Sequence, residues 1–179
     1  EALGPITGEA YLDYDYARLH IPKGSAPLFA PGTEHSANNQ SPVPAVWDVY
    51  REKALLDLSV NNPRVESQRS WYARHQRYLT RVMSRAEPYL YFILDEAIDR
   101  GLPSELILLP IVESAFDPFA YSHGQAAGMW QFIPGTGRAY GLKQTWWYEG
   151  RRDAVAATRA AFDYLEALNR QFDGDWMLA

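Results

Sequence analysis

Apolar residues recur at spacings of three and four along most of the chain after residue 45, and this periodicity limits the fold most strongly. Trp47, Tyr50 and Leu58 lie on one face of the first predicted helix. This helix begins at Val46 and ends before Pro63. No alternating strand pattern of any length competes, and no internal repeat at the periods of solenoid proteins is present. We therefore expect an all-α fold.

The same periodicity predicts further helices after the first one. They cover residues 64–83, 88–100, 104–114, 136–140 and 153–172. Pro88 suits a first helical turn and Asp153 suits an N-cap, while Gly101 and Gly174 suit the positions after a last turn. The segment 104–114 is apolar nearly all round, so we expect it to be buried, and Pro110 should kink it.

Residues 1–45 have a different character, with several prolines, turn-forming glycines and a polar run over residues 36–40. Their tyrosines are too frequent for a plain disordered tail. The sequence therefore predicts an irregular N-terminal arm over residues 1–45, laid on the surface of a helical domain over residues 46–179.

Charge and composition exclude several classes of function. A formal net charge of −5 argues against a nucleic-acid partner, because such proteins usually carry a basic face. The chain holds no cysteine, and its histidines are scattered with no pair at metal-ligand spacing. We expect no metal and no cofactor, and we interpret His123 as a loop or sugar-contacting residue. No run is long enough to span a membrane.

Glu113 is the candidate catalytic residue, since it closes the apolar segment 104–114. Burial disfavours the charged form of a carboxylic acid, and the negative end of a helix dipole acts in the same direction. A general acid must enter its reaction protonated, so the position suits acid catalysis. The alternative is a structural glutamate that caps a helix or pairs with an arginine.

Glycosidases usually use a second carboxylate as nucleophile or base. Asp117 is the nearest one along the chain, but Pro118 and the following turn signals favour a turn or cap role for it. A site with a single carboxylate leaves two mechanisms: water attacks with other help, or the substrate supplies its own nucleophile.

A dense motif follows Glu113-Ser114. Residues 122–134 have the sequence SHGQAAGMWQFIP, and Thr136-Gly137 comes directly after it. This ordered set resembles the signature of lytic transglycosylases with the goose-type lysozyme fold. The resemblance is strong from about residue 89 to the end and weaker over residues 46–83, and it implies a lysozyme-like, all-α catalytic domain.

The resemblance also implies a role for each matching residue. Glu113 matches the single acid/base that cuts peptidoglycan between N-acetylmuramic acid and N-acetylglucosamine without water, leaving a 1,6-anhydro sugar. Ser114 and Ser122 match polar residues near that site. Met129 and Gln131 match the pocket-shaping motif that holds the acid and the sugar. Tyr140 matches a sugar-side aromatic less closely.

One family motif, Ala-Tyr-Asn, has no counterpart before Ala179. We therefore expect the C-terminal part of the domain to be missing, with that portion or another polypeptide completing the groove. The resemblance implies glycan strands of peptidoglycan as partner and a periplasmic, outer-membrane-associated location through an anchor outside this chain. A hydrolytic muramidase on the same fold and a non-catalytic glycan-binding scaffold are the alternatives.

Overall fold

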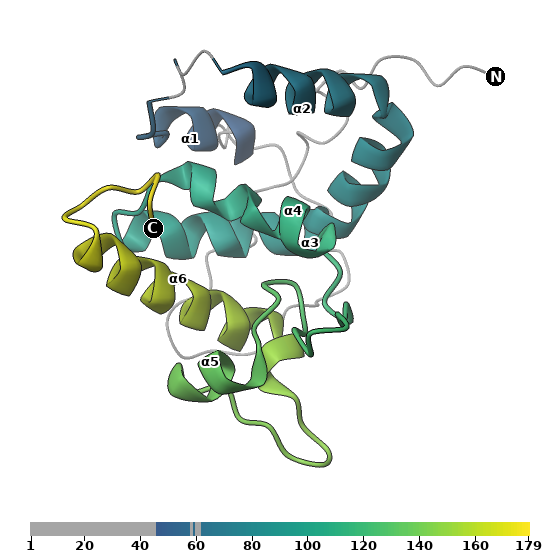
Figure 1. The fold of residues 1–179 in the computed structure, drawn as a ribbon, viewed down its shortest axis with the longest axis vertical. Helices are drawn as coiled ribbons and strands as arrows, with labels where there is room; N and C mark the ends of the chain where they lie inside the picture. Colours follow the sequence, from purple (N-terminus) through teal and green to yellow (C-terminus); the bar gives the residue numbers. More distant parts are fainter. Residues whose placement is uncertain (1–45, 58, 60–61) are drawn as a thin grey trace, which may run out of the picture.

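The computed structural model describes residues 46–57, 59 and 62–179, and the predicted arm over residues 1–45 lies outside this part. The fold is all-α, as predicted (Figure 1). Its α-helices are α1 (Val46–Glu52), α2 (Pro63–Arg74), α3 (Gln76–Asp99), α4 (Leu109–Ser114), α5 (Pro134–Ala139) and α6 (Ala154–Gln171). The short 3-10 helices of this described part are η3 (Ser104–Leu108) and η4 (Gly150–Arg152). Within the described residues, β-pairing is limited to isolated bridges.

The long helix α3 is the centre of the fold, because α1, α2, η3 and α6 all pack against it. In Figure 1, α1 and α2 lie on one side of α3, while α6 and α5 lie on the other. The buried core joins these elements through side chains from α3, η3, α6 and the loop before α5, including Leu94, Ile107, Phe116, Met129 and Phe162. None of the helices in the described part is long and apolar enough to cross a membrane.

Helix α6 matches the prediction for residues 153–172 closely. The Asp153 side chain accepts hydrogen bonds from the backbone N–H groups of Val155 and Ala156, at 3.0 and 2.9 Å, which is the expected N-cap. After the last turn, Gly174 has a φ of +92°, and its N–H donates to the carbonyl of Asn169. The residues that start and end this helix therefore act as the sequence indicates.

The predicted boundary between helices at residues 83–88 is wrong. The break lies at His75, and α3 continues through Pro88. Proline inside a helix costs about 3 kcal/mol. Burial of Leu90, Ile93 and Leu94 on the same helix outweighs this cost, because each contributes roughly 1.5–3 kcal/mol.

The first helix is also shorter than predicted, since α1 ends at Glu52. The carboxylate of Glu105 accepts hydrogen bonds from the backbone N–H groups of Leu55 and Leu56, at 3.2 and 2.9 Å. These contacts to η3 draw the chain away from helical geometry after α1. A carboxylate 50 residues away along the chain is invisible to local periodicity.

The predicted apolar helix 104–114 divides into η3 and α4. Pro110 lies in the first turn of α4, where a missing backbone N–H costs nothing, so it starts a helix rather than kinking one. The expectation of a buried segment is only half right. Ile107 is fully buried, but Val112 is 67% exposed and Glu113 is exposed beside it. The last turn of α4 therefore faces an opening in the surface.

Candidate active site

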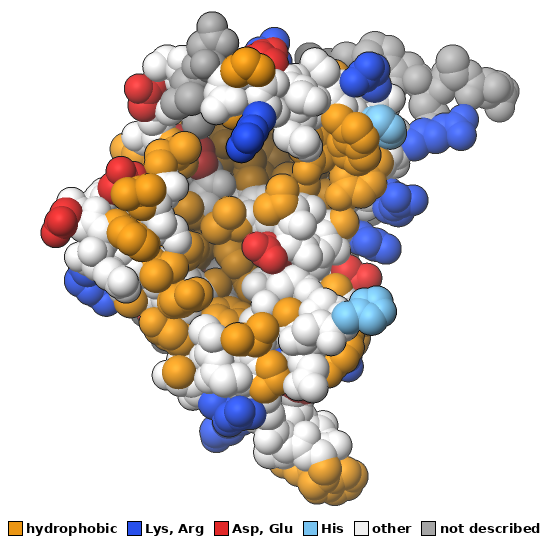
Figure 2. Space-filling model, viewed as in Figure 1, with side chains coloured by type: hydrophobic (Ala, Val, Ile, Leu, Met, Phe, Trp, Pro, Cys, Tyr) orange, Lys and Arg blue, Asp and Glu red, His pale blue; other side chains and the backbone are white. Residues whose placement is uncertain are grey.

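A pocket of about 440 Å³ lies beside the last turn of α4. It is enclosed by α4, α5, α6 and the α4–α5 loop, which we define as residues 115–133. Figure 2 shows apolar side chains gathered in a hollow on this face of the molecule. The lining residues are Leu109, Glu113, Trp130, Gln131, Phe132, Ile133, Thr136, Ala161, Tyr164, Leu165, Leu168 and Ala179.

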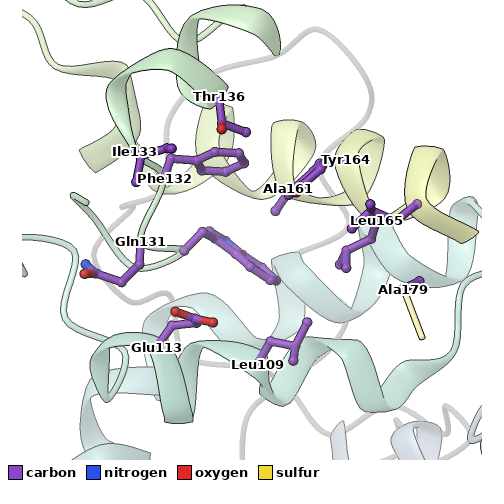
Figure 3. A pocket seen from close by; sticks show the side chains of 12 residues that line it. Leu109, Glu113, Gln131, Phe132, Ile133, Thr136, Ala161, Tyr164, Leu165 and Ala179 are labelled. Carbon is purple, nitrogen blue, oxygen red and sulfur yellow. The ribbon is translucent and has the colours of Figure 1, made fainter. Parts of the chain in front are cut away.

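Glu113 extends from α4 into this pocket (Figure 3). Its side chain is exposed, which corrects the expectation that it is buried within an apolar helix. The expectation failed because, of the residues in α4, only Pro110 is buried, while the turn that carries Glu113 borders the hollow. Among the described residues, Glu113 has no arginine partner and caps no helix. Its carboxylate is therefore accessible to a ligand.

Gln131 also lines this pocket, near Glu113 and at the end of the α4–α5 loop (Figure 3). Its backbone has a φ of +48°, a left-handed conformation that costs energy for a residue with a side chain. The side-chain Nε2 donates to the carbonyl of Gly128 at 2.7 Å, which fixes the direction of the amide. The sequence-predicted pair of Glu113 and Gln131 is thus brought to one cavity.

Ser114 and Met129 act behind the pocket rather than in its wall. The Ser114 hydroxyl donates to the carbonyl of Met129 at 2.8 Å and accepts from the N–H of Asp117 at 3.2 Å. The Met129 side chain is 1% exposed and packs in the core, so it presents no surface to a sugar. Together they tie the last turn of α4 to the α4–α5 loop.

Ser122 and Tyr140 do not line the pocket either. The Ser122 hydroxyl accepts from the backbone N–H of Ala126 at 3.0 Å and closes a turn in the α4–α5 loop. The ring of Tyr140 packs against that of Tyr164 with centroids 5.1 Å apart, so it supports a residue of the pocket wall. Asp117 is a turn residue, as predicted, because its Oδ1 accepts from the N–H of Phe119 at 2.9 Å.

A half-buried ion pair lies beneath the α4–α5 loop. Arg151, which is 4% exposed, donates from Nε and Nη2 to the two carboxylate oxygens of Glu149, at 2.8 and 2.7 Å. The hydrogen bond from Arg151 is the main cause that lowers the pKa of Glu149. The same bond is the main cause that raises the pKa of Arg151.

Sequence reasoning missed much of the pocket wall. The face of α6 that carries Tyr164, Leu165 and Leu168 borders the cavity. Helical periodicity identifies an apolar face but does not show whether another element covers it. Trp130 also lines the pocket and lies inside the 122–134 motif. The sequence could have indicated this role, because tryptophan combines a large apolar ring with one hydrogen-bond donor.

The pocket combines one carboxylic acid, Glu113, and one amide, Gln131, with mainly apolar walls. Glu113 is the only acidic side chain among the described residues that line it. No group of three or more potential metal ligands occurs within the described ranges. A single carboxylic acid can give a proton to a bound oxygen and take one back later, which is general acid–base catalysis.

Comparisons with known proteins agree with this geometry. Residues 91–179 match the family model of the transglycosylase SLT domain. The chain is 56% identical over 133 residues to membrane-bound lytic murein transglycosylase D from Escherichia coli (strain K12), covering 74% of this chain and 29% of the relative. The protein of the same name from Escherichia coli O6:H1 gives the same values. A protein of Alteromonas sp. (strain M-1) named for tributyltin chloride resistance is 45% identical over 108 residues, 58% of this chain and 52% of that relative.

Proposed function

Because this chain belongs to the lytic transglycosylases through its transglycosylase SLT domain, we propose that it cuts glycan strands of peptidoglycan with Glu113 as the sole acid and base. The bond cut is the β-1,4 bond between N-acetylmuramic acid and N-acetylglucosamine. The chain spans less than a third of the length of its Escherichia coli relatives. The activity of the whole protein is therefore part of this proposal.

In the proposed reaction, Glu113 first protonates the oxygen that bridges the two sugars, and the bond from that oxygen to C1 of the muramic acid breaks. The C6 hydroxyl of the same muramic acid attacks C1 and gives its proton to the Glu113 carboxylate. The acid is restored, no water is consumed, and the product carries a 1,6-anhydro ring. A strand lying over Glu113 keeps water away from the reacting C1 of the muramic acid.

One observation carries this mechanism: Glu113 is the only acidic side chain lining the described pocket. A glycosidase that uses a covalent intermediate or an activated water needs a second carboxylate facing the sugar. The C6 hydroxyl of the muramic acid can take the place of this second carboxylate, because it is tethered to the reacting sugar. Well-oriented intramolecular nucleophiles reach effective concentrations on the order of 10⁵–10⁸ M. The pocket geometry thus favours a substrate that supplies its own nucleophile.

The remaining predicted residues take supporting roles in the proposal. Gln131 lines the same pocket as Glu113, and we propose that it contacts the sugar. Ser114 fixes the last turn of α4, through the carbonyl of Met129. Ser122 is proposed to shape the α4–α5 loop, and Tyr140 is proposed to support Tyr164 in the pocket wall.

The products of digestion test the proposal. The protein is incubated with purified sacculi, and the released muropeptides are analysed by mass spectrometry. We expect anhydro-ended products that are lighter by one water than the products of hydrolysis. Reducing ends would instead identify a hydrolytic muramidase. Binding to sacculi without any release would support the non-catalytic scaffold and contradict the proposed activity.

The relatives from Escherichia coli are named membrane-bound murein enzymes, which supports a place in the cell envelope for this protein too. We propose the periplasm, with attachment to the outer membrane by an anchor outside this chain. Fractionation of the native bacterium with an antibody against this domain tests the location. Recovery in the cytoplasmic fraction would contradict it.

A further inference from the structure

The α4–α5 loop, which carries Gln131, is held in a conformation that its own residues disfavour. Gln125 and Gln131 have φ values of +65° and +48°, in the left-handed region that side chains disfavour. Such residues persist only where surrounding contacts fix them. The contacts that fix this loop therefore decide where the Gln131 amide stands relative to Glu113.

Arg151 supplies two of these contacts from beneath the loop. Its Nη1 donates to two loop carbonyls, that of Gln125 at 2.7 Å and that of Phe132 at 3.0 Å. One of these carbonyls belongs to a left-handed residue, and the other follows Gln131 directly. A single guanidinium thus joins both ends of the segment 125–132.

The backbone of Arg151 contacts the same segment from a second direction. A Cβ placed on Gly128 would lie 1.7 Å from the Arg151 carbonyl oxygen, so the loop rests directly on this residue. Glu149 in turn holds the guanidinium through its two carboxylate oxygens. Bidentate pairing leaves Nη1 pointing at the loop, an arrangement that the ammonium group of lysine cannot reproduce.

We propose that Arg151, oriented by Glu149, is a positioning residue that holds Gln131 in the wall of the pocket that contains Glu113. The expected effect on catalysis rests on the proposed function. The expected effect on the position of Gln131 does not depend on it. Arg151 itself does not line the pocket. It acts through the loop carbonyls, so its loss displaces Gln131 without removing any group that a sugar would touch.

The test compares Arg151→Lys with Arg100→Lys. Arg100 is a matched control, because its Nη1 bonds Asp163 at 2.6 Å in an ion-pair cluster between α3 and α6 that does not line the pocket. Folding of both variants is checked by far-UV and near-UV circular dichroism. Glu149→Gln is the second test variant. It keeps the Arg151 side chain but weakens the paired hydrogen bonds that orient its guanidinium.

The first readout is the NMR signal of the Gln131 side-chain amide, assigned in isotope-labelled protein. We expect it to shift in Arg151→Lys and Glu149→Gln and to stay unchanged in Arg100→Lys. This readout needs no activity, so it decides the positioning role even if the protein cuts nothing. An unshifted amide in folded Arg151→Lys would overturn the proposal.

The second readout is the kinetics of sacculus digestion. We expect kcat to fall by about 100-fold in Arg151→Lys with little change in KM, because a catalytic site tolerates only small misplacement. Arg100→Lys is expected to keep the activity of the original protein. A folded Arg151→Lys variant with full activity would also overturn the proposal, whereas absence of cutting by the original protein would overturn only the proposed function.

Discussion

A carboxylic acid can serve as proton donor and proton acceptor in one reaction only if a ligand can reach its carboxyl group. Glu113 meets this condition, since it is exposed in the pocket and lies outside the ion pairs of the described residues. The neighbouring carboxylates that are engaged, Asp117 and Glu149, serve a turn and an ion pair. At the scale of single residues, accessibility separates the candidate acid from its structural neighbours.

Glu113→Gln should abolish cutting of sacculi, because an amide cannot donate a proton to the bridging oxygen. Loss of general acid–base catalysis typically costs 10²–10⁴-fold, and more where one residue does both steps. Release of anhydro-muropeptides from sacculi measures the effect. Asp117→Asn is the matched control, since it removes a carboxylate near the same helix end, and we expect it to retain activity. Undiminished release by Glu113→Gln would remove Glu113 from the mechanism.

The Glu149–Arg151 pair makes stability depend on pH. The pKa of Glu149 lies below its ordinary value of 4.5, chiefly because Arg151 donates a hydrogen bond to it. A carboxyl with a lowered pKa stabilises the folded state above its unfolded-state pKa, and this stabilisation is lost as pH falls through the folded-state pKa. We therefore expect the free energy of unfolding to decrease as pH falls below 4.5.

Urea unfolding across the acidic range measures this dependence. Glu149→Gln should flatten the acid-side decrease, because the variant has no proton to bind at this position. Glu52→Gln is the control, since Glu52 is 71% exposed and pairs only with its neighbour Lys53 in the described structure. An unchanged acid-side slope in Glu149→Gln would show that the pair does not set the pH dependence.

At the scale of elements, the sequence predicted correctly those helix boundaries that depend on contacts between residues close together in the chain. Helix α6 has its cap, its apolar face and its stop within its own sequence, and all were found in the structure. The end of α1 and the passage of α3 through Pro88 depend on Glu105 and on core packing. These contacts join residues far apart in the sequence, so periodicity could not reveal them.

The candidate site divides in the same way. Glu113 and Gln131 were predicted from an ordered motif, and the structure brings both to one pocket. Burial of Arg151 rather than Arg152 had no local signal, because neighbouring arginines in a short loop look alike until the loop is folded. The apolar wall of α6 was visible as a pattern, but its exposure to the cavity was not.

Helix α6 supplies a wall of the pocket, so its stability affects the site. Asp153→Ala removes the acceptor of two backbone N–H groups and a hydrogen bond from the Tyr148 hydroxyl. We expect a loss of about 1 kcal/mol in the free energy of unfolding, measured by urea denaturation. Asp153→Ser should retain most of the stability, because serine also caps helices. Equal losses in both variants would mean that capping is not the cause.

At the scale of the whole molecule, one core connects the helices around α3 to the pocket. Trp130 belongs to both, since it lines the pocket and packs against the ring of Phe162, with centroids 5.6 Å apart. The division into a helical domain over residues 46–179 and an arm before it stays a prediction. Within the described part, some residues both stabilise the core and line the pocket. A substitution in the core should therefore also change the shape of the pocket.

Thr158 offers a test of this coupling. Its side chain is fully buried on α6, and its hydroxyl oxygen accepts a hydrogen bond from the indole N–H of Trp130 at 3.0 Å. Thr158→Val keeps the shape but leaves a buried donor without a partner, which costs about 1–3 kcal/mol. Thr158→Ser keeps the acceptor and loses one methyl group, worth about 0.8 kcal/mol. We therefore expect valine to destabilise the protein more than serine does.

Urea unfolding gives the order of the two variants, and hydrogen exchange at the Trp130 indole shows whether the bond is the cause. The indole N–H should exchange slowly in the original protein and in Thr158→Ser, and faster in Thr158→Val. If valine proved no worse than serine, packing alone would hold Trp130 in place. If the predicted order holds, one buried hydrogen bond between α6 and the α4–α5 loop fixes a wall of the pocket, and core stability and ligand binding should weaken together in Thr158→Val.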